Sequence, residues 1–288
     1  GATGYVGLDL INLLIKHPNI KIVELCAKNN IGKKINLFDQ RIKKKLPRIS
    51  SIKKVNWEKI DTLFLSLPNG EAQKIVKKLF HKYPKIKFID LSADFRLTKS
   101  AIYKSWYKIN HSCPELINNS IYSISEFVKT NIKKYRIISN PGCYPTSIQL
   151  ALIPLLKKNL INTKDIIIDS KSGYSGAGKK FEEKFNHKNL YKSTFAYSVT
   201  HHRHMAELDQ EIKKQSGKKI NYVFNPHIVP SFRGIISSIY VKTKTKITGK
   251  KLLSTLKKFY KNNKFIKVVK YNQPIKTGDV LNTNMCQI

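Results

Sequence analysis

Cys143 is the residue whose surroundings point most directly to covalent chemistry. The apolar stretch 135–138 predicts a short strand, Pro141-Gly142 predicts a turn, and Pro145 suits the first position of a helix. Cys143 would then lie at the N-terminus of that helix, where unpaired N–H groups and the positive end of the helix dipole stabilise a thiolate. We therefore predict a nucleophile here. A buried structural cysteine is the alternative, which the Pro-Gly turn and the polar helix start disfavour.

A thiol nucleophile needs a proton acceptor nearby, and the segment His202-Arg203-His204 supplies two imidazoles. Residues two apart diverge on a helix but can face one site in a strand or a bend. The residue types alone leave open which histidine carries the proton, and a structural or surface role is the alternative for either. His201 adds a third imidazole, to which we assign no role.

Three glycines at the start of the chain suggest a nucleotide loop. Gly1, Gly4 and Gly7 have the spacing that lets the pyrophosphate of a dinucleotide approach a helix N-terminus, although an ordinary glycine-containing turn would look similar. In NAD-binding proteins a carboxylate at the end of the second strand binds the ribose, but here that strand ends in Ala27-Lys28-Asn29-Asn30. Lys28 could pair with a 2′-phosphate, which favours NADP. An ordinary surface lysine is the alternative in a chain so rich in lysine.

The elements that must position these residues alternate in the first half of the chain. The pattern predicts helices over about 5–16 and 71–82, and strands over 20–27, 62–67 and 88–91. Alternation of this kind is typical of a parallel sheet covered by helices. Beyond Cys143, longer extended segments at 165–171, 222–229 and 234–244 alternate with helices and predict a second, mixed α+β domain.

These patterns occur in a series that resembles the N-acetyl-gamma-glutamyl-phosphate reductase family, the arginine-pathway relative of aspartate-semialdehyde dehydrogenase. The matching segments span nearly the whole chain, in family order. They are Gly1-Ala2-Thr3-Gly4-Tyr5-Val6-Gly7, Leu67-Pro68-Asn69-Gly70, Asp90-Leu91-Ser92-Ala93-Asp94-Phe95-Arg96-Leu97, Ser139-Asn140-Pro141-Gly142-Cys143-Tyr144-Pro145-Thr146, Ser172-Gly173-Tyr174-Ser175-Gly176-Ala177-Gly178, His202-Arg203-His204 and Pro226-His227-Ile228-Val229-Pro230. One departure is Ala206, which precedes Glu207 where family members usually have proline.

The resemblance implies NADPH-dependent reductive dephosphorylation of N-acetyl-L-glutamyl 5-phosphate to N-acetyl-L-glutamate 5-semialdehyde, with release of phosphate. It implies a thioester at Cys143, with His204 as acid/base and His202 as a neighbour that orients or binds. The cofactor-binding residues that it implies are Gly1, Thr3, Gly4, Tyr5, Val6, Gly7, Ser66, Pro68, Ser175 and Gly176, to which the residue types at the strand end add Lys28. The substrate-binding residues that it implies are Arg96, Asn140, Ser172, Gly173 and Arg203.

The residues themselves leave alternatives to two of these assignments. For Arg96, an ion pair with Asp94 or Asp90 is an equal alternative to anion binding. For the segment 172–178, the alternative is a loop with no ligand. No metal site is expected, because the histidines and carboxylates have no recognised ligand spacing and this chemistry requires no metal.

The resemblance also gives the domain organisation. It implies a Rossmann-type NADP-binding domain over residues 1–142, and a mixed α+β catalytic and dimerisation domain over 143–288 that self-associates to a dimer or tetramer. A dinucleotide loop should follow a strand, yet Gly1 opens the sequence. We therefore expect the first strand of the sheet, and the family's last strand and helix, to lie outside this sequence.

Composition limits the other classes of function. The 288 residues carry a formal charge of +36, but the lysines are spread along the whole chain together with Ile and Asn, so we expect no specific nucleic-acid partner. No apolar run approaches the roughly 20 residues of a membrane helix, and no membrane association is expected. Four cysteines without a paired spacing favour a reduced, cytoplasmic setting.

Two readings compete with the family's reaction. Aspartate-semialdehyde dehydrogenase uses the same cysteine and cofactor chemistry on a shorter substrate. The chain could also be a basic binding protein that keeps a dehydrogenase fold without turnover. Cysteine-dependent activity, or salt-sensitive association with nucleic acid in its absence, would separate the two classes.

Overall fold

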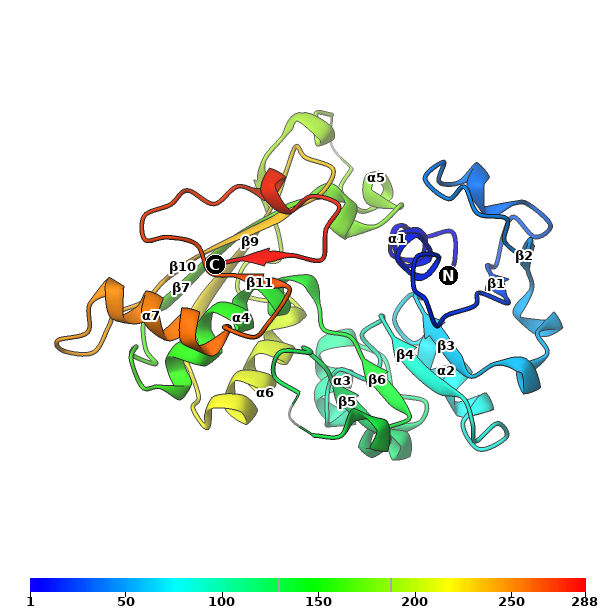
Figure 1. The fold of residues 1–288 in the computed structure, drawn as a ribbon, viewed down its shortest axis with the longest axis horizontal. Helices are drawn as coiled ribbons and strands as arrows, with labels where there is room; N and C mark the ends of the chain where they lie inside the picture. Colours follow the sequence, from blue (N-terminus) through cyan, green and yellow to red (C-terminus); the bar gives the residue numbers. More distant parts are fainter. Residues whose placement is uncertain (129, 187) are drawn as a thin grey trace. The chain divides into compact units, whose positions relative to one another are not determined.

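A computed structural model describes residues 1–128, 130–186 and 188–288 of the chain (Figure 1). They form two compact units. The first contains Gly1–Ser123 and the stretch that ends at Asn140, and the second contains Ile124–Val128 and Pro141–Ile288. The predicted fold class is confirmed, because the sheets of the first unit are parallel and the main sheet of the second is mixed.

The first unit is built on a four-stranded parallel sheet in the order β3-β4-β6-β5. Its strands are β3 (Thr62–Leu65), β4 (Lys87–Asp90), β5 (Ser120–Tyr122) and β6 (Ile137–Ser139). A separate parallel pair consists of β1 (Leu25–Cys26) and β2 (Ile49–Ser50). The helices of this unit are α1 (Tyr5–Leu14), α2 (Glu71–Leu79) and α3 (Ser100–Tyr107).

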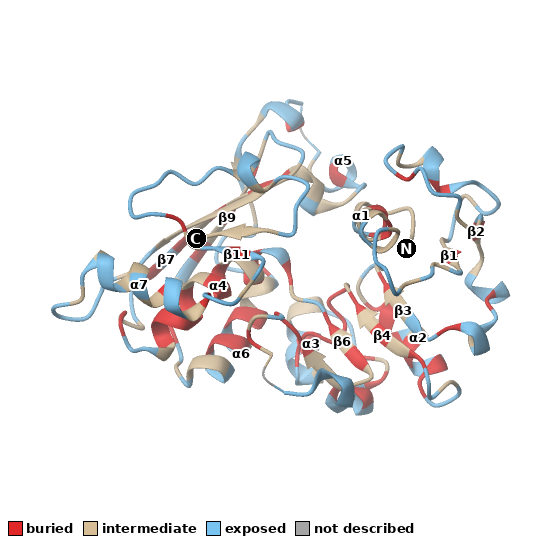
Figure 2. Cartoon of the chain, viewed as in Figure 1, coloured by how far each residue is buried: buried red, intermediate tan, exposed pale blue. Residues whose placement is uncertain are grey.

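Helix α2 shows how the sequence pattern builds this unit. Ala72, Val76 and Leu79 are buried at helical spacing against the sheet, whereas Lys74, Lys77 and Lys78 face solvent. Gly70 caps the helix in the left-handed region, at φ 87°, where a residue without a Cβ is favoured. Burial in Figure 2 follows the same division, with buried positions along the strands and the inner faces of the helices.

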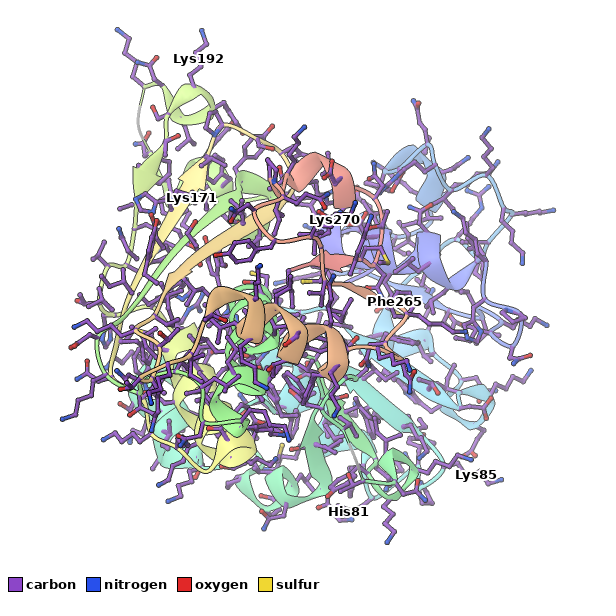
Figure 3. All side chains as sticks on the ribbon, turned by 60° about the vertical axis from the view of Figure 1, so that its left-hand side comes forward. His81, Lys85, Lys171, Lys192, Phe265 and Lys270 are labelled. Atoms are coloured by element: carbon purple, nitrogen blue, oxygen red, sulfur yellow. The ribbon has the colours of Figure 1, made fainter. Side chains whose placement is uncertain are left out.

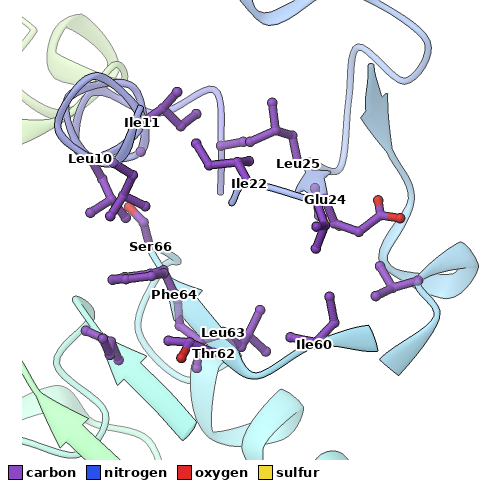
Figure 4. Close-up of a pocket in the computed structure, with 18 of the residues that line it drawn as sticks. Leu10, Ile11, Ile22, Glu24, Leu25, Ile60, Thr62, Leu63, Phe64 and Ser66 are labelled. Carbon is purple, nitrogen blue, oxygen red and sulfur yellow. The ribbon is translucent and has the colours of Figure 1, made fainter. Parts of the chain in front are cut away.

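The predicted strand 20–27 is wrong in extent, because only Leu25 and Cys26 form ladder bonds. The residues before them line a cavity of about 580 Å³ that lies between β1 and β3 and is closed on one side by α1 (Figure 4). Its labelled wall is mostly apolar and includes Leu10, Ile22 and Leu63. The edge of β3 opposite β4 faces this cavity, so the parallel sheet is interrupted here. A strand before the glycine loop stays a prediction.

The second unit is built on a mixed sheet in the order β10-β7-β9-β8. Its strands are β7 (Ile166–Gly173), β8 (Phe195–Ala196), β9 (Tyr222–Val229) and β10 (Ile235–Tyr240), with a small pair β11 (Ile266–Lys267) and β12 (Cys286–Gln287). The helices are α4 (Cys143–Lys157), α5 (Phe181–Lys184), α6 (His204–Ser216) and α7 (Gly249–Phe259). Helix α4 packs against β10, α6 and α7.

The two faces of this mixed sheet differ. Side chains at alternate positions such as Ile168 and Ser170 are fully buried, and Ser147 of α4 hydrogen-bonds Ser237 on this face at 2.8 Å. The opposite face carries Ile167, Val223 and Tyr240, which are 50, 51 and 60% exposed and are paired across neighbouring strands. We call this the open sheet face; it also carries the side chains of Asp169, Lys171 and His227.

Positive charge is spread over both units, as the sequence predicts. Figure 3 shows the labelled Lys85, Lys171, Lys192 and Lys270 on separate segments of the chain. No helix of the described residues is both long and apolar enough to cross a lipid bilayer.

Candidate active site

Cys143 is the first residue of α4 and is exposed to solvent. Gly142 is the N-cap, and its carbonyl oxygen accepts bonds from the N–H and the hydroxyl of Thr146, at 3.0 and 2.9 Å. Pro145 is therefore the third helical residue rather than the predicted first. Proline is tolerated at either position because the N–H groups of the first turn have no intrahelical partner. The thiol lies where unpaired N–H groups and the helix dipole favour a thiolate.

Two histidines lie beside the residues that flank Cys143. A Cβ on Gly142 would lie 2.6 Å from Nε2 of His204, so the imidazole packs directly on the Gly142 backbone. The ring of Tyr144 is 5.9 Å from that of His204 and 5.6 Å from that of His202, both edge-on. Because His204 begins α6 and His202 precedes it, a bend brings the two imidazoles to 4.7 Å. The residues thus converge as expected for a bend rather than a helix.

The two histidines have different protonation chemistry. Nδ1 of His202 accepts the N–H of His204 at 3.2 Å, which requires an unprotonated nitrogen at that position. Burial, and next the neighbouring His204, Arg203 and Lys184, lower the pKa of His202 to about 3. His202 is therefore neutral near pH 7 and orients its neighbour, which leaves His204 as the candidate acid/base.

Sequence reasoning missed three side chains around the nucleophile. The Tyr144 hydroxyl donates to the His227 carbonyl at 3.1 Å and accepts from the Tyr197 hydroxyl at 3.4 Å. Burial raises the pKa of Tyr197 to about 12, so its proton is retained. Glu207, fully buried in the first turn of α6, accepts the N–H of Gly142 at 2.8 Å. Tyr144 lies within a recognised motif and Glu207 follows another closely, so position in the sequence could have indicated both. Tyr197 adjoins no motif.

The predicted substrate residues Ser172 and Gly173 lie at the end of β7, and the predicted cofactor residues Ser175 and Gly176 follow it. Ser172 is buried, and its hydroxyl donates to the Gly173 carbonyl at 3.0 Å. A Cβ on Gly173 would lie 2.7–2.8 Å from the backbone of residues 231–233, so only glycine fits there. Ser175 and Gly176 follow in a 3-10 turn, and the Ser175 N–H donates to the Phe232 carbonyl at 3.0 Å. Arg203 is exposed and precedes α6.

Arg96 and Asn140 are joined in the first unit. The buried Arg96 donates through Nε to the Asn140 carbonyl at 2.8 Å and through a terminal nitrogen to the Leu91 carbonyl at 3.3 Å. Asp94 accepts the N–H groups of Gly70 and Gln73 and the Tyr103 hydroxyl, at 2.7–3.0 Å. Arg96 thus supports the backbone three residues before Cys143 along the chain.

The glycine loop of the first unit fits a dinucleotide. A Cβ on Gly1 would lie 1.7 Å from the Ser66 carbonyl oxygen, and one on Gly7 would lie 2.3 Å from the Gly1 carbonyl oxygen. Gly4, the N-cap of α1, has only one such neighbour, at an ordinary 3.5 Å, so its missing side chain leaves space at the helix N-terminus. Thr3, Tyr5 and Val6 complete the loop and the first turn of α1, and Pro68 follows β3.

Two further features bear on the cofactor and on metals. Lys28 is exposed two residues after β1, and Glu24, the carboxylate before β1, instead accepts the Ser50 hydroxyl at 2.9 Å. Within 1–128, 130–186 and 188–288, no group of three His, Cys, Asp or Glu side chains could hold a metal ion.

Comparisons with known proteins divide the chain in a similar way. The model of the semialdehyde dehydrogenase NAD-binding domain matches residues 1–135, and that of the semialdehyde dehydrogenase dimerisation domain matches 143–288. The chain is 41% identical over 288 residues to an N-acetyl-gamma-glutamyl-phosphate reductase of Afipia carboxidovorans, covering 99% of this chain and 82% of that protein. It is also 41% identical over 290 residues to one of Vesicomyosocius okutanii, with coverages of 100 and 84%.

Solved structures with the same fold are aspartate semialdehyde dehydrogenases. That of Francisella tularensis has a TM-score of 0.69 and 15% identity over 100% of this chain and 87% of that chain. That of Candida albicans, solved with NADP, has a TM-score of 0.62 and 16% identity over 97 and 84%. At such low identity these likenesses show the fold alone.

Proposed function

We propose that this chain, which belongs to the N-acetyl-gamma-glutamyl-phosphate reductase family, performs the family's reaction through a covalent cysteine. The reaction is the NADPH-dependent reductive dephosphorylation of N-acetyl-L-glutamyl 5-phosphate to N-acetyl-L-glutamate 5-semialdehyde, a step of arginine biosynthesis. The observation that carries the proposal is the exposed Cys143 at the start of α4, flanked by two residues that both contact His204.

The residues of the second unit can perform the covalent steps. His204 takes the thiol proton, and the Cys143 thiolate attacks the acyl carbon of the substrate. The tetrahedral adduct expels phosphate and leaves a thioester on Cys143. NADPH, when bound, supplies the hydride that reduces this thioester. His204 then gives its proton to the oxyanion and takes it back as the thiohemiacetal releases the aldehyde and the cysteine thiolate. Neutral His202 keeps the His204 backbone in place through the bond to Nδ1.

The groups that would hold the cofactor are the loop Gly1–Gly7 with Ser66 and Pro68, and, in the second unit, Ser175 and Gly176. The loop supports this because Gly1 and Gly7 permit a close approach of backbone to backbone while Gly4 leaves space at the N-terminus of α1. Preference for NADP over NAD is supported by Lys28 and by the lack of a carboxylate in 27–30, directly after β1. A helix N-terminus and a lysine both favour phosphate groups.

The substrate would contact Ser172, Gly173 and Arg203 in the second unit, and Arg96 and Asn140 in the first. Arg203 is the exposed cation among these, suited to the anionic substrate. The four cysteines are reduced thiols rather than disulfides, which supports a reducing compartment such as the cytoplasm.

The oligomer we propose is a homodimer, or a tetramer built from dimers, that associates through the open sheet face. Ile167, Val223 and Tyr240 on this face are 50–60% exposed, and their neighbours are polar. An apolar centre with polar surroundings is typical of protein interfaces. The match of residues 143–288 to a dimerisation domain supports self-association through the second unit.

The test is the reverse reaction, phosphate-dependent reduction of NADP with an aldehyde. Wild type and Cys143→Ser are assayed in parallel with N-acetyl-glutamate semialdehyde and with aspartate semialdehyde. Activity on the first aldehyde alone, lost with the cysteine while NADPH still binds, supports the proposal. Preference for the second aldehyde would instead assign the protein the aspartate-semialdehyde dehydrogenase reaction. No activity on either, with salt-sensitive binding of nucleic acid, would instead favour a binding protein.

A further inference from the structure

Glu207 is a buried carboxylate in the candidate active site, and the mechanism above gives it no role. Its side chain is completely inaccessible to solvent in the first turn of α6. A buried carboxylate is costly unless hydrogen bonds or an opposite charge compensate it. The partners of Glu207 in this structure therefore indicate what its charge is for.

The first partner is the backbone directly before the nucleophile. One carboxylate oxygen, Oε2, accepts the N–H of Gly142 at 2.8 Å. This N–H belongs to the N-cap residue of α4, and Cys143 follows it. The bond joins the start of α6 to the start of α4 and so fixes the turn that presents the sulfur.

The second partner is the acid/base candidate. The other oxygen, Oε1, is 3.9 Å from Nε2 of His204, and the same imidazole lies on the Cα of Gly142, where no Cβ is present. Glu207, Gly142 and His204 therefore touch one another beside Cys143. At this separation a carboxylate favours the protonated imidazole.

The negative charge of Glu207 matters because positively charged side chains also lie near the two histidines. Charged or titratable groups around the pair include His202, Arg203, Cys143, Tyr144, Tyr197, Lys184 of α5 and Glu211 one turn along α6. Arg203 and Lys184 disfavour a proton on His202. The carboxylate of Glu207 lies 3.9 Å from Nε2 of His204, so its negative charge favours a proton on that imidazole.

We propose that Glu207 is a positioning residue: it fixes the Gly142 turn before the nucleophile and holds the proton that His204 accepts from Cys143 and later donates. This inference rests on the proposed function for the identity of the nucleophile. It goes beyond that function because it assigns the coupling between the sulfur and the histidine to a third, buried side chain. Glu207 touches neither substrate nor cofactor in this role.

The test measures thiol reactivity and so needs neither substrate nor cofactor. The rate of Cys143 alkylation by iodoacetamide is followed from pH 5 to 10 by mass spectrometry of its peptide. Cys143 is the exposed cysteine, whereas Cys113 is buried and burial raises the pKa of Cys26 and Cys286. The chains compared are wild type, Glu207→Gln, Glu207→Asp and the matched control Glu211→Gln, which alters another buried glutamate of α6.

In Glu207→Gln the amide oxygen can still accept the Gly142 N–H, but the charge is gone. Alkylation at pH 7 is expected to slow about tenfold or more, because an opposite charge within 4–6 Å changes a protonation equilibrium by at least that factor. The pH midpoint should rise, and kcat should fall while the Kd of NADPH stays unchanged. Glu207→Asp, which keeps the charge, should lie closer to wild type, and Glu211→Gln should match it.

A double-mutant cycle with His204→Gln shows whether Glu207 acts through the histidine. If it does, Glu207→Gln should not slow alkylation further in a chain that already carries His204→Gln. Wild-type alkylation in Glu207→Gln, or an equal loss in Glu211→Gln, would overturn the proposal. If wild type oxidises neither aldehyde but its alkylation depends on Glu207, the substrate assignment fails and the positioning role stands. If turnover is normal in Glu207→Gln, the positioning role fails alone. Circular dichroism of each variant identifies any that has not folded, and Glu207→Asp then carries the comparison.

Discussion

Two glycines of the first unit should separate the folding of the cofactor loop from the binding of the cofactor. In Gly7→Ala the new methyl would lie 2.3 Å from the Gly1 carbonyl oxygen and 2.9 Å from that of Ala2. Both are backbone atoms, so the loop must move, at a cost of about 1–3 kcal/mol. Alanine recovers about 1 kcal/mol through its higher helix propensity. A net loss of up to about 2 kcal/mol corresponds to a fall in Tm of up to about 8 °C.

Gly4→Ala is the matched control, because its methyl would meet only the Gly1 carbonyl oxygen, at 3.5 Å. Replacing glycine by alanine at an N-cap should cost under about 1 kcal/mol. The methyl, however, occupies the space at the N-terminus of α1, so the Kd of NADPH should rise about 10- to 100-fold as charge-assisted bonds are lost.

The assays are thermal denaturation by circular dichroism and titration with NADPH by fluorescence. Gly7→Ala should lose both stability and binding, and Gly4→Ala chiefly binding. The reasoning is refuted if Gly7→Ala melts and binds NADPH like wild type, or if Gly4→Ala is destabilised as much as Gly7→Ala.

Three further results are expected. Lys28→Ala should raise the Kd of NADPH about tenfold in a fluorescence titration and leave the Kd of NADH nearly unchanged. Equal losses of affinity for both cofactors would show that Lys28 does not bind the 2′-phosphate. Burial raises the pKa of Asp90 from 3.8 to about 6, so the folded chain keeps a proton that the unfolded chain loses between those pH values. Urea titrations should therefore show the free energy of unfolding falling by about 3 kcal/mol as pH rises across this window, and Asp90→Asn should flatten the fall. On the open sheet face, Ile167→Lys should halve the mass measured by light scattering, whereas Leu37→Lys, at a 71% exposed position of the first unit, should not; an unchanged mass for Ile167→Lys would exclude this face.

The sequence predicts well the elements that have one buried face. Strand β9 has the predicted bounds of Tyr222–Val229, and β7 and α2 differ from prediction only at their ends. The alternating spacing of apolar residues in the strands, and the helical spacing in α2, indicate which side of each element is buried. The segment 20–27 is equally apolar but mostly unpaired, because a strand also needs a neighbour, and the neighbouring space is the cavity. The strand propensity of a segment does not show whether a neighbouring strand is available to pair with it.

The candidate site divides in the same way. Cys143 and the two histidines could be predicted because their residue types and local spacing indicate a thiol nucleophile with an imidazole acid/base. The contacts of Glu207 and Tyr197 could not be predicted, even though Glu207 follows a motif, since each partner is far away in sequence: Gly142 is 65 positions from Glu207, and Tyr144 is 53 from Tyr197. A single sequence shows spacing along the chain, whereas such pairs depend on how α4, α6 and β8 pack.

The glycine loop is attached to a very short strand. The nitrogens of Gly1 and Ala2 both donate to the Cys26 carbonyl, at 2.9 and 3.0 Å, and Cys26 is the last residue of the two-residue β1. Strand pairs this short open easily, because few hydrogen bonds must break together. The loop therefore moves whenever β1 moves, and a nucleotide that orders the loop also orders β1. Cofactor binding should consequently slow amide hydrogen exchange in β1 and α1 much more than in β4 and β6.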